Sequence, residues 1–361
     1  MVDFALIGGF LGAGKTSLMC RIGQDLSAAG RRVALITNDQ AADLVDSEYA
    51  RRLGLPVSEI AGGCFCCRFQ DLVKAYDEIL AAVAPEVVLA EPVGSCADLN
   101  ATVMQPLKRF YGDRLRPLAY SVLVDPERTA ELLDEPGAST PLGYLYGQQI
   151  AEADLLVLTK GDRLSAEARD GLLTRLSRRL PATPALWLSA HSGVGVDEWW
   201  RRVGALPGVG QRLLDIDYDT YAEAEAALGW LNATVSLRAE RPFATGELLA
   251  ELLRDLRHGA ARALAAIGHL KALLTTAERS LRGNVTGSQT PVELTGEGWP
   301  TTAAELTLNA RIELAPDELE ALVRRALRRV GNQFGAAPTV LRLECFRPGR
   351  PQPTWRFDEA I

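Results

Sequence analysis

The chain has 361 residues, of which 47% are hydrophobic and 24% charged, and its formal net charge is −7. This length allows two or three domains, and the acidic balance argues against a nucleic-acid-binding protein, whose phosphate contacts need a basic surface. The short, glycine-containing apolar start is unlike a signal peptide, and no apolar run is long enough to cross a membrane. We therefore expect a cytoplasmic protein that keeps its six cysteines as thiols.

Short apolar runs alternate with amphipathic helical stretches over residues 1–208. The run 2–8 ends in glycines, and helical periodicity follows from Lys15 to about Ala29. This alternation predicts an α/β domain with a doubly wound, mostly parallel sheet, because crossover helices join parallel strands and cover both faces. Further strands are predicted at Val33–Thr37, Glu86–Glu91, Tyr120–Asp125, Asp154–Thr159 and Ala185–Ser189, and helices at Gln70–Val83 and Ser165–Arg179.

The pattern changes after Leu206, where Pro207–Gly210 is typical of a linker. We place the linker at residues 209–225 and a smaller second domain at residues 226–361, with an extended tail from Arg347. Two strand–helix–strand units predict an α+β domain of ferredoxin-like type. Its strands are predicted at Trp230–Leu237, His269–Thr275, Ser280–Val285, Glu305–Leu314 and Val340–Phe346, and its helices at Gly246–His258 and Pro316–Val330.

Gly9-Phe10-Leu11-Gly12-Ala13-Gly14-Lys15-Thr16 matches the phosphate-loop pattern without substitution and lies between a predicted strand and a predicted helix. Backbone N–H groups of such a loop point at phosphate oxygens, and the following helix adds its positive end. We expect Lys15 to lie between the β- and γ-phosphates and the Thr16 hydroxyl to bind Mg²⁺. The predicted nucleotide-binding residues of the loop are Gly9, Gly12, Ala13, Gly14, Lys15, Thr16 and Ser17.

Two acidic residues follow at predicted strand ends, where ligands of parallel sheets gather. Asp39 follows the second strand, and Glu91 ends the next one in Glu91-Pro92-Val93-Gly94. Either carboxylate is a candidate Mg²⁺ ligand, and Lys15, Thr16 and Glu91 are the candidate catalytic residues. The alternative is that each acid only caps a local turn.

Thr159-Lys160-Gly161-Asp162 follows a very apolar predicted strand. A carboxylate at Asp162 would accept the N1 and N2 hydrogens of guanine and repel adenine, while the Lys160 stem packs on the base. Thr159 stands where many GTPases have Asn, which predicts a weaker internal brace. Ser189 and Ala190, after the next strand, are predicted to approach the guanine O6.

Three of the six cysteines lie within four positions in Gly62-Gly63-Cys64-Phe65-Cys66-Cys67. Neighbouring Cys66 and Cys67 are poor disulfide partners, but three thiolates can surround one soft cation and leave a fourth position open. Such sulfur-rich sites favour Zn²⁺ or Cu⁺ and can take Co²⁺ or Ni²⁺. The alternatives are a fixed structural zinc or a buried thiol cluster. Cys20, Cys96 and Cys345 are expected to be core residues.

In this order, Gly9–Thr16, Gly62–Cys67, Glu91–Gly94 and Thr159–Asp162 resemble the CobW-like P-loop GTPases, relatives of HypB and UreG. The resemblance covers essentially the whole chain. It implies GTP or GDP with Mg²⁺ on the phosphate loop, a transition metal on Cys64, Cys66 and Cys67, and a role as a GTP-dependent metal chaperone. Some such proteins are linked to cobalamin synthesis and others to nitrile hydratase activation.

The chain departs from the family pattern at two places. The usual Asn-Glu-Phe-Gly is Asn38-Asp39-Gln40-Ala41 here, and the shorter Asp39 has less reach toward Mg²⁺. In place of a histidine-rich metal-storage segment there are three separate histidines, at positions 191, 258 and 269.

We predict a slow GTPase that carries a transition metal, Zn²⁺ or else Co²⁺, and transfers it to a client metalloenzyme or apo-protein. A homodimer is compatible with this prediction, and neither nucleic acid nor membrane is expected as a partner. Two alternatives stay open: a regulatory GTPase switch with a permanent structural zinc, and a P-loop kinase.

Overall fold

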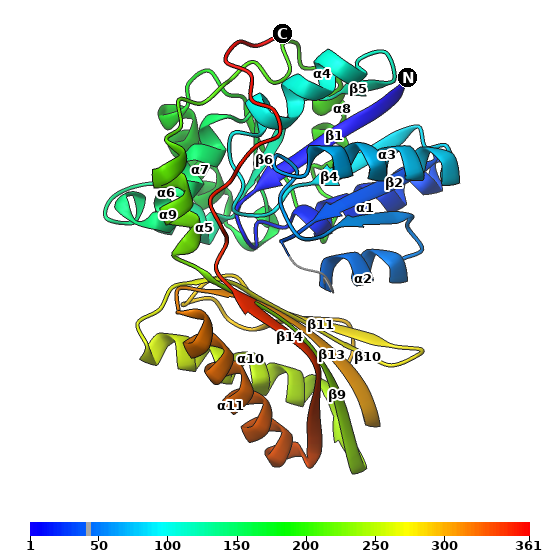
Figure 1. Cartoon of the computed structure of the whole chain (residues 1–361), viewed down its shortest axis with the longest axis vertical. Coiled ribbons are helices and arrows are strands. Elements are labelled where there is room, and N and C mark those ends of the chain that lie inside the picture. Colours follow the sequence, from blue (N-terminus) through cyan, green and yellow to red (C-terminus); the bar gives the residue numbers. More distant parts are fainter. Residues whose placement is uncertain (41–44) are drawn as a thin grey trace. The chain divides into compact units, whose positions relative to one another are not determined.

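The computed structural model describes residues 1–40 and 45–361, which form two compact units. The first unit comprises Met1–Gln40, Ala50–Ala224 and Arg350–Ile361, and the second comprises Glu225–Gly349 with residues 45–49 (Figure 1). The chain therefore returns to the first unit with its last residues. The predicted division assigned all of residues 226–361 to one domain.

A parallel sheet of eight strands is the centre of the first unit. Its order is β3-β2-β4-β1-β6-β7-β8, and β5 pairs with the beginning of β1. Because the chain moves from β1 toward both edges, right-handed crossovers put helices on both faces, and the predicted doubly wound sheet is confirmed. The strands are β1 (Val2–Gly9), β2 (Val33–Asn38), β3 (Val57–Ile60), β4 (Val87–Glu91), β5 (Leu115–Pro117), β6 (Ser121–Val124), β7 (Leu155–Leu158) and β8 (Ala185–Trp187).

The helices of this region begin and end close to their predicted positions where the apolar period is strong. Helix α1 runs over Lys15–Ala28 and α3 over Phe69–Val83, each within one or two residues of its prediction. The other helices are α2 (Val45–Arg52), α4 (Gln105–Tyr111), α5 (Pro126–Leu132), α6 (Pro141–Ala151), α7 (Ala166–Arg179), α8 (Val196–Ala205) and α9 (Tyr218–Ala226), with short turns η1 (Asn100–Met104), η2 (Gly137–Ser139) and η3 (Gly161–Arg163).

The second unit is an antiparallel sheet of six strands in the order β12-β11-β10-β13-β9-β14. Strand β13 lies between β9 and β10, so β9–α10–β10 and β13–α11–β14 are the two split βαβ units of a ferredoxin-like fold, as predicted. The hairpin of β11 and β12 extends the sheet beside β10. The elements are β9 (Gly229–Ala244), α10 (Thr245–Arg262), β10 (Ile267–Thr275), β11 (Ser280–Val285), β12 (Glu293–Thr295), β13 (Pro300–Ile312), α11 (Pro316–Phe334) and β14 (Ala336–Phe346).

Helices α10 and α11 lie together on one face of this sheet (Figure 1) and bury its apolar side chains, including Leu270 and Leu308. On the strands' polar side, the first residues of α2 belong to the same unit: Asn309 Oδ1 accepts the Val45 N–H at 3.1 Å, and Lys271 pairs with Asp46.

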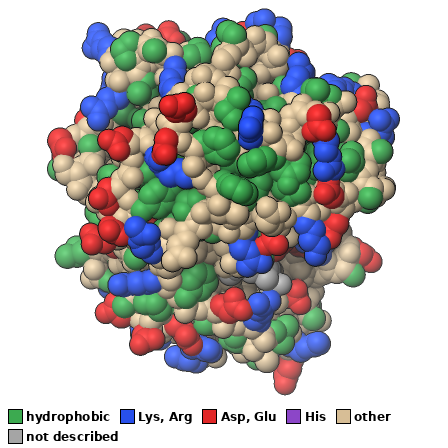
Figure 2. Space-filling view, turned by 45° about the horizontal axis from the view of Figure 1, so that its top comes forward, with side chains coloured by type: hydrophobic (Ala, Val, Ile, Leu, Met, Phe, Trp, Pro, Cys, Tyr) green, Lys and Arg blue, Asp and Glu red, His purple; other side chains and the backbone are tan. Residues whose placement is uncertain are grey.

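The surface mixes charges of both signs. On the face shown in Figure 2, acidic and basic side chains are interspersed, with hydrophobic side chains between them. None of the described helices combines the length and apolar character that crossing a bilayer requires.

Candidate nucleotide and metal site

The phosphate loop connects β1 to α1 and is held by its own backbone. Gly9 has a φ of 126°, and a Cβ there would lie 2.3 Å from the Leu123 carbonyl oxygen on β6, so only glycine fits. Lys15 folds back over the loop, and its Nζ donates to the Gly9 carbonyl at 2.8 Å. The charged end of Lys15 therefore lies on the loop that would cradle the phosphates.

Glu91, at the end of β4, meets the phosphate loop. The Thr16 hydroxyl lies 2.9 and 3.0 Å from the two carboxylate oxygens of Glu91, and both residues are buried. A Cβ on Gly94 would lie 3.1 Å from Lys15 Nζ, so the turn after β4 also touches the loop. Gln149 holds this turn, because its Nε2 donates to the carbonyls of Gly94 and Cys96 at 3.0 and 2.9 Å.

The predicted base-reading turn follows β7 and is tied to the phosphate loop. The Thr159 hydroxyl lies 2.9 Å from the Ala13 carbonyl oxygen and 3.2 Å from that of Val124, so threonine supplies a brace that was expected to be weak. Lys160 has a φ of 53° and pairs with the buried Asp125 after β6. The Asp162 side chain is exposed.

Ser189 and Ala190 follow β8 beside that turn. The Gly161 N–H donates to the Leu188 carbonyl at 3.2 Å, which joins the two loops directly. Ser189 is buried, and its Oγ accepts the Ser192 N–H at 3.1 Å, whereas Ala190 is half-buried. The Ser189 hydroxyl therefore shapes its own turn.

The cysteine loop lies between β3 and α3 and brings three sulfurs together. The ligand atoms of Cys64, Cys66 and Cys67 all lie within 4.8 Å of one another. Cys64 Sγ is 2.8 Å from Cys66 Sγ, and Cys66 Sγ is 3.8 Å from Cys67 Sγ. Cys64 and Cys66 are buried, while Cys67 is half-buried.

The three thiols share protons unequally. Hydrogen bonds from Cys66 and Cys67 lower the pKa of Cys64 well below its ordinary value. Hydrogen bonds with Cys64 and Cys67, together with burial, raise the pKa of Cys66. The hydrogen bond with Cys64, together with burial, raises the pKa of Cys67 to about 11, although the bond with Cys66 acts in the opposite direction. The loop therefore favours one thiolate stabilised by two neighbouring thiols, and a cation that replaced their protons would meet a preassembled sulfur set.

Asn38, at the end of β2, holds the cysteine loop by its main chain. Its Nδ2 donates to the carbonyls of Ile60 and Gly63 at 3.0 and 2.7 Å, and its Oδ1 accepts the Phe65 N–H at 2.9 Å. The next residue, Asp39, accepts the Gln40 N–H on Oδ1 at 2.7 Å. The contacts described thus bring Thr16 and Glu91 together, whereas Asp39 shapes the turn that it begins.

A family model for the CobW/HypB/UreG nucleotide-binding domain matches residues 3–185, half of the chain. The chain belongs to the CobW/HypB/UreG family. The match runs from β1 to the beginning of β8 and includes the phosphate loop, the cysteine loop, Glu91 and the base-reading turn.

The curated relatives are zinc chaperones and a urease accessory protein. The chain is 28% identical over 208 residues to the zinc chaperone CobW of Pseudomonas aeruginosa, covering 49% of this chain and 53% of that protein. It is 29% identical over 224 residues to the urease accessory protein UreG of Mycolicibacterium gilvum, covering 56% and 95%. It is 29% identical over 170 residues to the zinc chaperone YeiR of Escherichia coli, covering 46% and 49%. The chain spans about half the length of the zinc chaperones it matches.

Among solved structures, the chain resembles the Zn(II)-bound YjiA GTPase of E. coli, with 16% identity and a TM-score of 0.40 over 90% of this chain and 98% of that one. It also resembles HypB of Helicobacter pylori in complex with nickel, with 12% identity and a TM-score of 0.41 over 55% and 84%. These two likenesses concern the fold alone.

This CobW/HypB/UreG protein has site residues that its sequence did not point to. Cys96 is buried in the core, as expected, and its thiol also lies near enough to Cys64 and Cys66 to shift the pKa of both. Asp125 and Asn38 likewise act over long sequence distances. The only local signal for Cys96 was its place just after Glu91-Pro92-Val93-Gly94.

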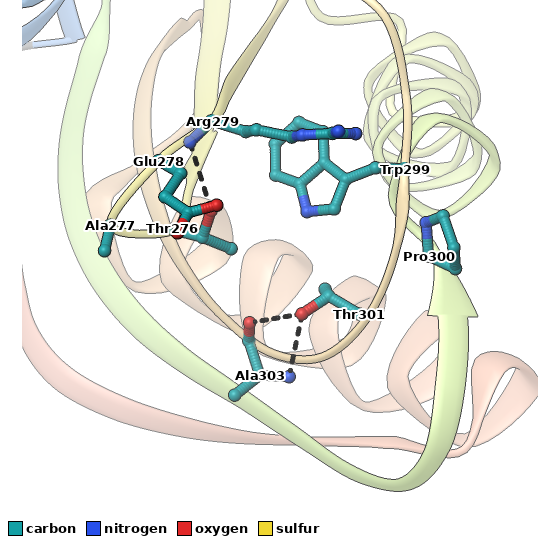
Figure 3. A pocket seen from close by; sticks show the side chains of 8 residues that line it. All are labelled: Thr276, Ala277, Glu278, Arg279, Trp299, Pro300, Thr301 and Ala303. Atoms are coloured by element: carbon teal, nitrogen blue, oxygen red, sulfur yellow. Dashed lines mark hydrogen bonds between the residues drawn. The ribbon is translucent and has the colours of Figure 1, made fainter.

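The second unit of this family member contains a pocket of about 600 Å³. Figure 3 shows its lining side chains, which come from the turn between β10 and β11 (Thr276–Arg279) and from the beginning of β13 (Trp299–Ala303). Among the eight described lining residues, Glu278 is the one acid, and cysteine and histidine are missing. That set lacks the cysteine and histidine donors of a transition-metal site.

Proposed function

We propose that this chain is a GTP-hydrolysing metallochaperone that carries a transition metal, Zn²⁺ foremost and Co²⁺ next, on Cys64, Cys66 and Cys67 and delivers it to a client metalloenzyme. The observation that carries this proposal is the short physical link between the nucleotide loop and the sulfur cluster. The turn from Glu91 to Cys96 reaches from one to the other, because the Glu91 carboxylate accepts the Thr16 hydroxyl and the Cys96 thiol lowers the pKa of Cys64.

The sulfur cluster fits a tetrahedral thiophilic cation. Zinc–sulfur bonds of about 2.3 Å at tetrahedral angles put sulfurs roughly 3.8 Å apart. The Cys66–Cys67 distance is already 3.8 Å, while the Cys64–Cys66 distance of 2.8 Å must lengthen. Three protein ligands leave one position for a sulfur or nitrogen of the receiving site, which suits transfer.

The nucleotide groups fit Mg²⁺–GTP. The Thr16 hydroxyl and the Glu91 carboxylate supply the oxygen ligands that Mg²⁺ prefers, and bound Mg²⁺ would neutralise phosphate charge. Lys15 must exchange the Gly9 carbonyl for phosphate oxygens, and Asp162 is proposed to read the guanine edge. Thr159 keeps the base-reading turn in register with the loop.

The turn after β4 can couple the nucleotide site to the sulfur cluster. Gly94 lies against Lys15, so a γ-phosphate bound by Lys15 would press on or order this turn. Two residues later, the Cys96 thiol lies near enough to Cys64 and Cys66 to shift the pKa of both. We propose that the nucleotide state changes the position of Cys96 and thereby the grip of the sulfur cluster on its cargo.

The test is a zinc titration of the wild type and of a Cys64→Ser/Cys66→Ser/Cys67→Ser variant, each with a non-hydrolysable GTP analogue and with GDP. We expect the wild type to bind one zinc with affinities that differ about tenfold between nucleotides, within the usual range of allosteric coupling. The triple variant should lose this site. Cys345→Ser, which removes a half-buried thiol on β14, is the matched control and should bind like the wild type.

Two results would contradict the proposal. Equal zinc affinities in both nucleotide states would support a regulatory GTPase with a permanent structural zinc. A preference for ATP over GTP would instead support a P-loop kinase.

A further inference from the structure

The last residues of the chain run across the cysteine loop. We call residues 350–361 the C-terminal strap; they belong to the first unit and form its red segment in Figure 1. The Gln352 N–H donates to Cys67 Sγ at 3.1 Å. The Thr354 N–H donates to the Cys66 carbonyl at 2.9 Å, and its hydroxyl donates to the Cys67 carbonyl at 3.1 Å. The strap therefore contacts both the backbone and one ligand sulfur of the proposed metal loop.

An ion pair with a buried carboxylate fastens the strap beside this loop. Arg356 Nε lies 2.9 Å from Oδ2 of Asp98, which is fully buried and also accepts the Tyr218 hydroxyl at 2.8 Å. Asp98 comes two residues after Cys96, on the same turn that begins at Glu91. Removal of Arg356 would leave the buried Asp98 carboxylate with one partner fewer, so this pair is the latch of the docked strap.

Most of the rest of the strap lies on the surface, although Pro351 is buried. The Phe357 N–H donates to the Ala101 carbonyl at 3.1 Å, and the Trp355 ring lies 5.0 Å from the Phe110 ring. Trp355 and Phe110 are 41% and 45% exposed, so lifting the strap would separate two rings that solvent already reaches. At its beginning, Arg350 pairs with Asp219 in an exposed ion pair, which contributes little.

We propose that the C-terminal strap is a lid on the sulfur cluster: docked, it positions Cys67 for the metal, and it must lift from Cys66 and Cys67 before the metal can pass to an acceptor. The inference rests on the proposed function, since it assumes that these sulfurs carry the cargo. An N–H donor to a ligand thiolate stabilises its charge and fixes its direction, and such outer contacts typically change metal affinity 10- to 100-fold. Gln352, Thr354 and Arg356 are positioning residues in this scheme.

The sharpest variant removes one backbone hydrogen. Gln352→Pro deletes the N–H that donates to Cys67 Sγ, and position 352 already lies between Pro351 and Pro353, where the chain favours extended backbone. Gln352→Ala keeps that N–H and is the matched control. Arg356→Ala breaks the latch, and Arg350→Ala removes the exposed pair on the same strap.

Two measurements are made on the full-length protein. In the metal-free protein, the rate at which a maleimide alkylates Cys67 is followed by mass spectrometry. In the zinc-loaded protein, the rate at which a chromophoric chelator removes zinc is followed by absorbance. We expect Gln352→Pro and Arg356→Ala to raise both rates about tenfold, and Gln352→Ala and Arg350→Ala to match the wild type.

The outcomes separate the two proposals. If Gln352→Pro and Arg356→Ala release zinc at the wild-type rate, the strap does not control the metal, and the lid is overturned whatever the alkylation shows. If the wild type binds no zinc on these cysteines, the proposed function fails and the lid's role in release fails with it. The alkylation rates would still show whether the strap covers Cys67. If Arg356→Ala unfolds, Asp98→Asn/Arg356→Ala removes the latch without leaving a buried charge, and the same rates decide.

Discussion

The nucleotide loop and the cysteine loop are built in opposite ways. The groups expected to hold the nucleotide come from the ends of several strands, and each is braced by the sheet: Thr16 by Glu91, Thr159 by Ala13 and Val124, Lys160 by Asp125. The three sulfurs come from four consecutive positions, but the loop that carries them depends on distant segments for its shape.

This difference makes the nucleotide site rigid and leaves the cysteine loop adjustable. Buried strands on both sides fix the nucleotide groups, so a bound nucleotide meets a frame that is already formed. A few hydrogen bonds, from Asn38 on one side and from the C-terminal strap on the other, orient the cysteine loop. A site that must release its cargo gains from being held by few, separable contacts.

The largest effect is expected on nucleotide affinity, at Asp162, which is proposed to bind the guanine base. Asp162→Asn should weaken GTP binding about a hundredfold, because each hydrogen bond to a charged acceptor contributes about 1.5–3 kcal/mol. Binding of xanthosine triphosphate should improve, since the new amide can donate to the carbonyl that xanthine carries at position 2. Nucleotide titration by calorimetry measures both changes, and zinc affinity without nucleotide should stay constant.

Asp170→Asn, on the exposed face of α7, is the control for the loss of one acidic charge. An Asp162→Asn variant that keeps the wild-type preference for GTP over ATP would remove Asp162 from the base site.

An intermediate effect on stability and zinc affinity is expected at Asn38, which holds the cysteine loop. Asn38→Ala removes two donors and one acceptor from the cysteine loop, so the free energy of unfolding should fall by about 1–3 kcal/mol. Zinc affinity should fall with it, while GTP affinity changes less. Urea unfolding and zinc competition measure the two losses, with the exposed Asn332→Ala on α11 as control. Equal losses of zinc and GTP affinity would mean that the two sites are one rigid body.

The smallest effect is expected at Glu152, which holds Asn100 in the segment that follows Cys96. Glu152 is fully buried; its Oε2 accepts the Asn100 N–H at 3.1 Å, and burial raises its pKa well above the ordinary value. The folded protein therefore holds this proton at pH values where the unfolded chain has lost it. The stabilising contribution is present below the unfolded pKa and is lost as the pH rises through the folded pKa.

The glutamine of a Glu152→Gln variant cannot ionise, so this variant should not lose stability through this group as the pH rises. Its stability relative to the wild type should increase with pH above about 4.5, as denaturant unfolding at several pH values will show. Glu167→Gln, in the exposed first turn of α7, should leave the wild-type pH dependence unchanged. A flat difference between Glu152→Gln and the wild type would mean that Glu152 does not titrate differently on folding.

The elements that could be predicted from the sequence are those whose pattern lies within one continuous segment. The period of α1 and the apolar runs of β1 and β7 were visible because each pattern is local. Strand β3 was missed, since Val57-Ser58-Glu59-Ile60 pairs only with β2 at the sheet edge and needs few apolar residues.

The support of the candidate site was not predictable in the same way. Cys96 and the strap reach the sulfurs only through tertiary packing, across gaps in sequence that carry no periodic signal. The tail after Arg347 was expected to be extended, but nothing in its prolines indicated what it would lie against. The brace expected to be weak at Thr159 is made by a hydroxyl that reaches two carbonyls.

The strand order of the second unit has a consequence for how anything can bind there. At one edge, β12 has only three residues, which leaves little backbone to pair with a new strand. At the other, β14 contains Pro338, which lacks an N–H, and its register with β9 shifts between Val340 and Arg342. Both borders are therefore poor templates for strand addition. A protein that docks on this unit is therefore expected to bind through side-chain contacts. The same edges also offer little backbone for aggregation by strand pairing.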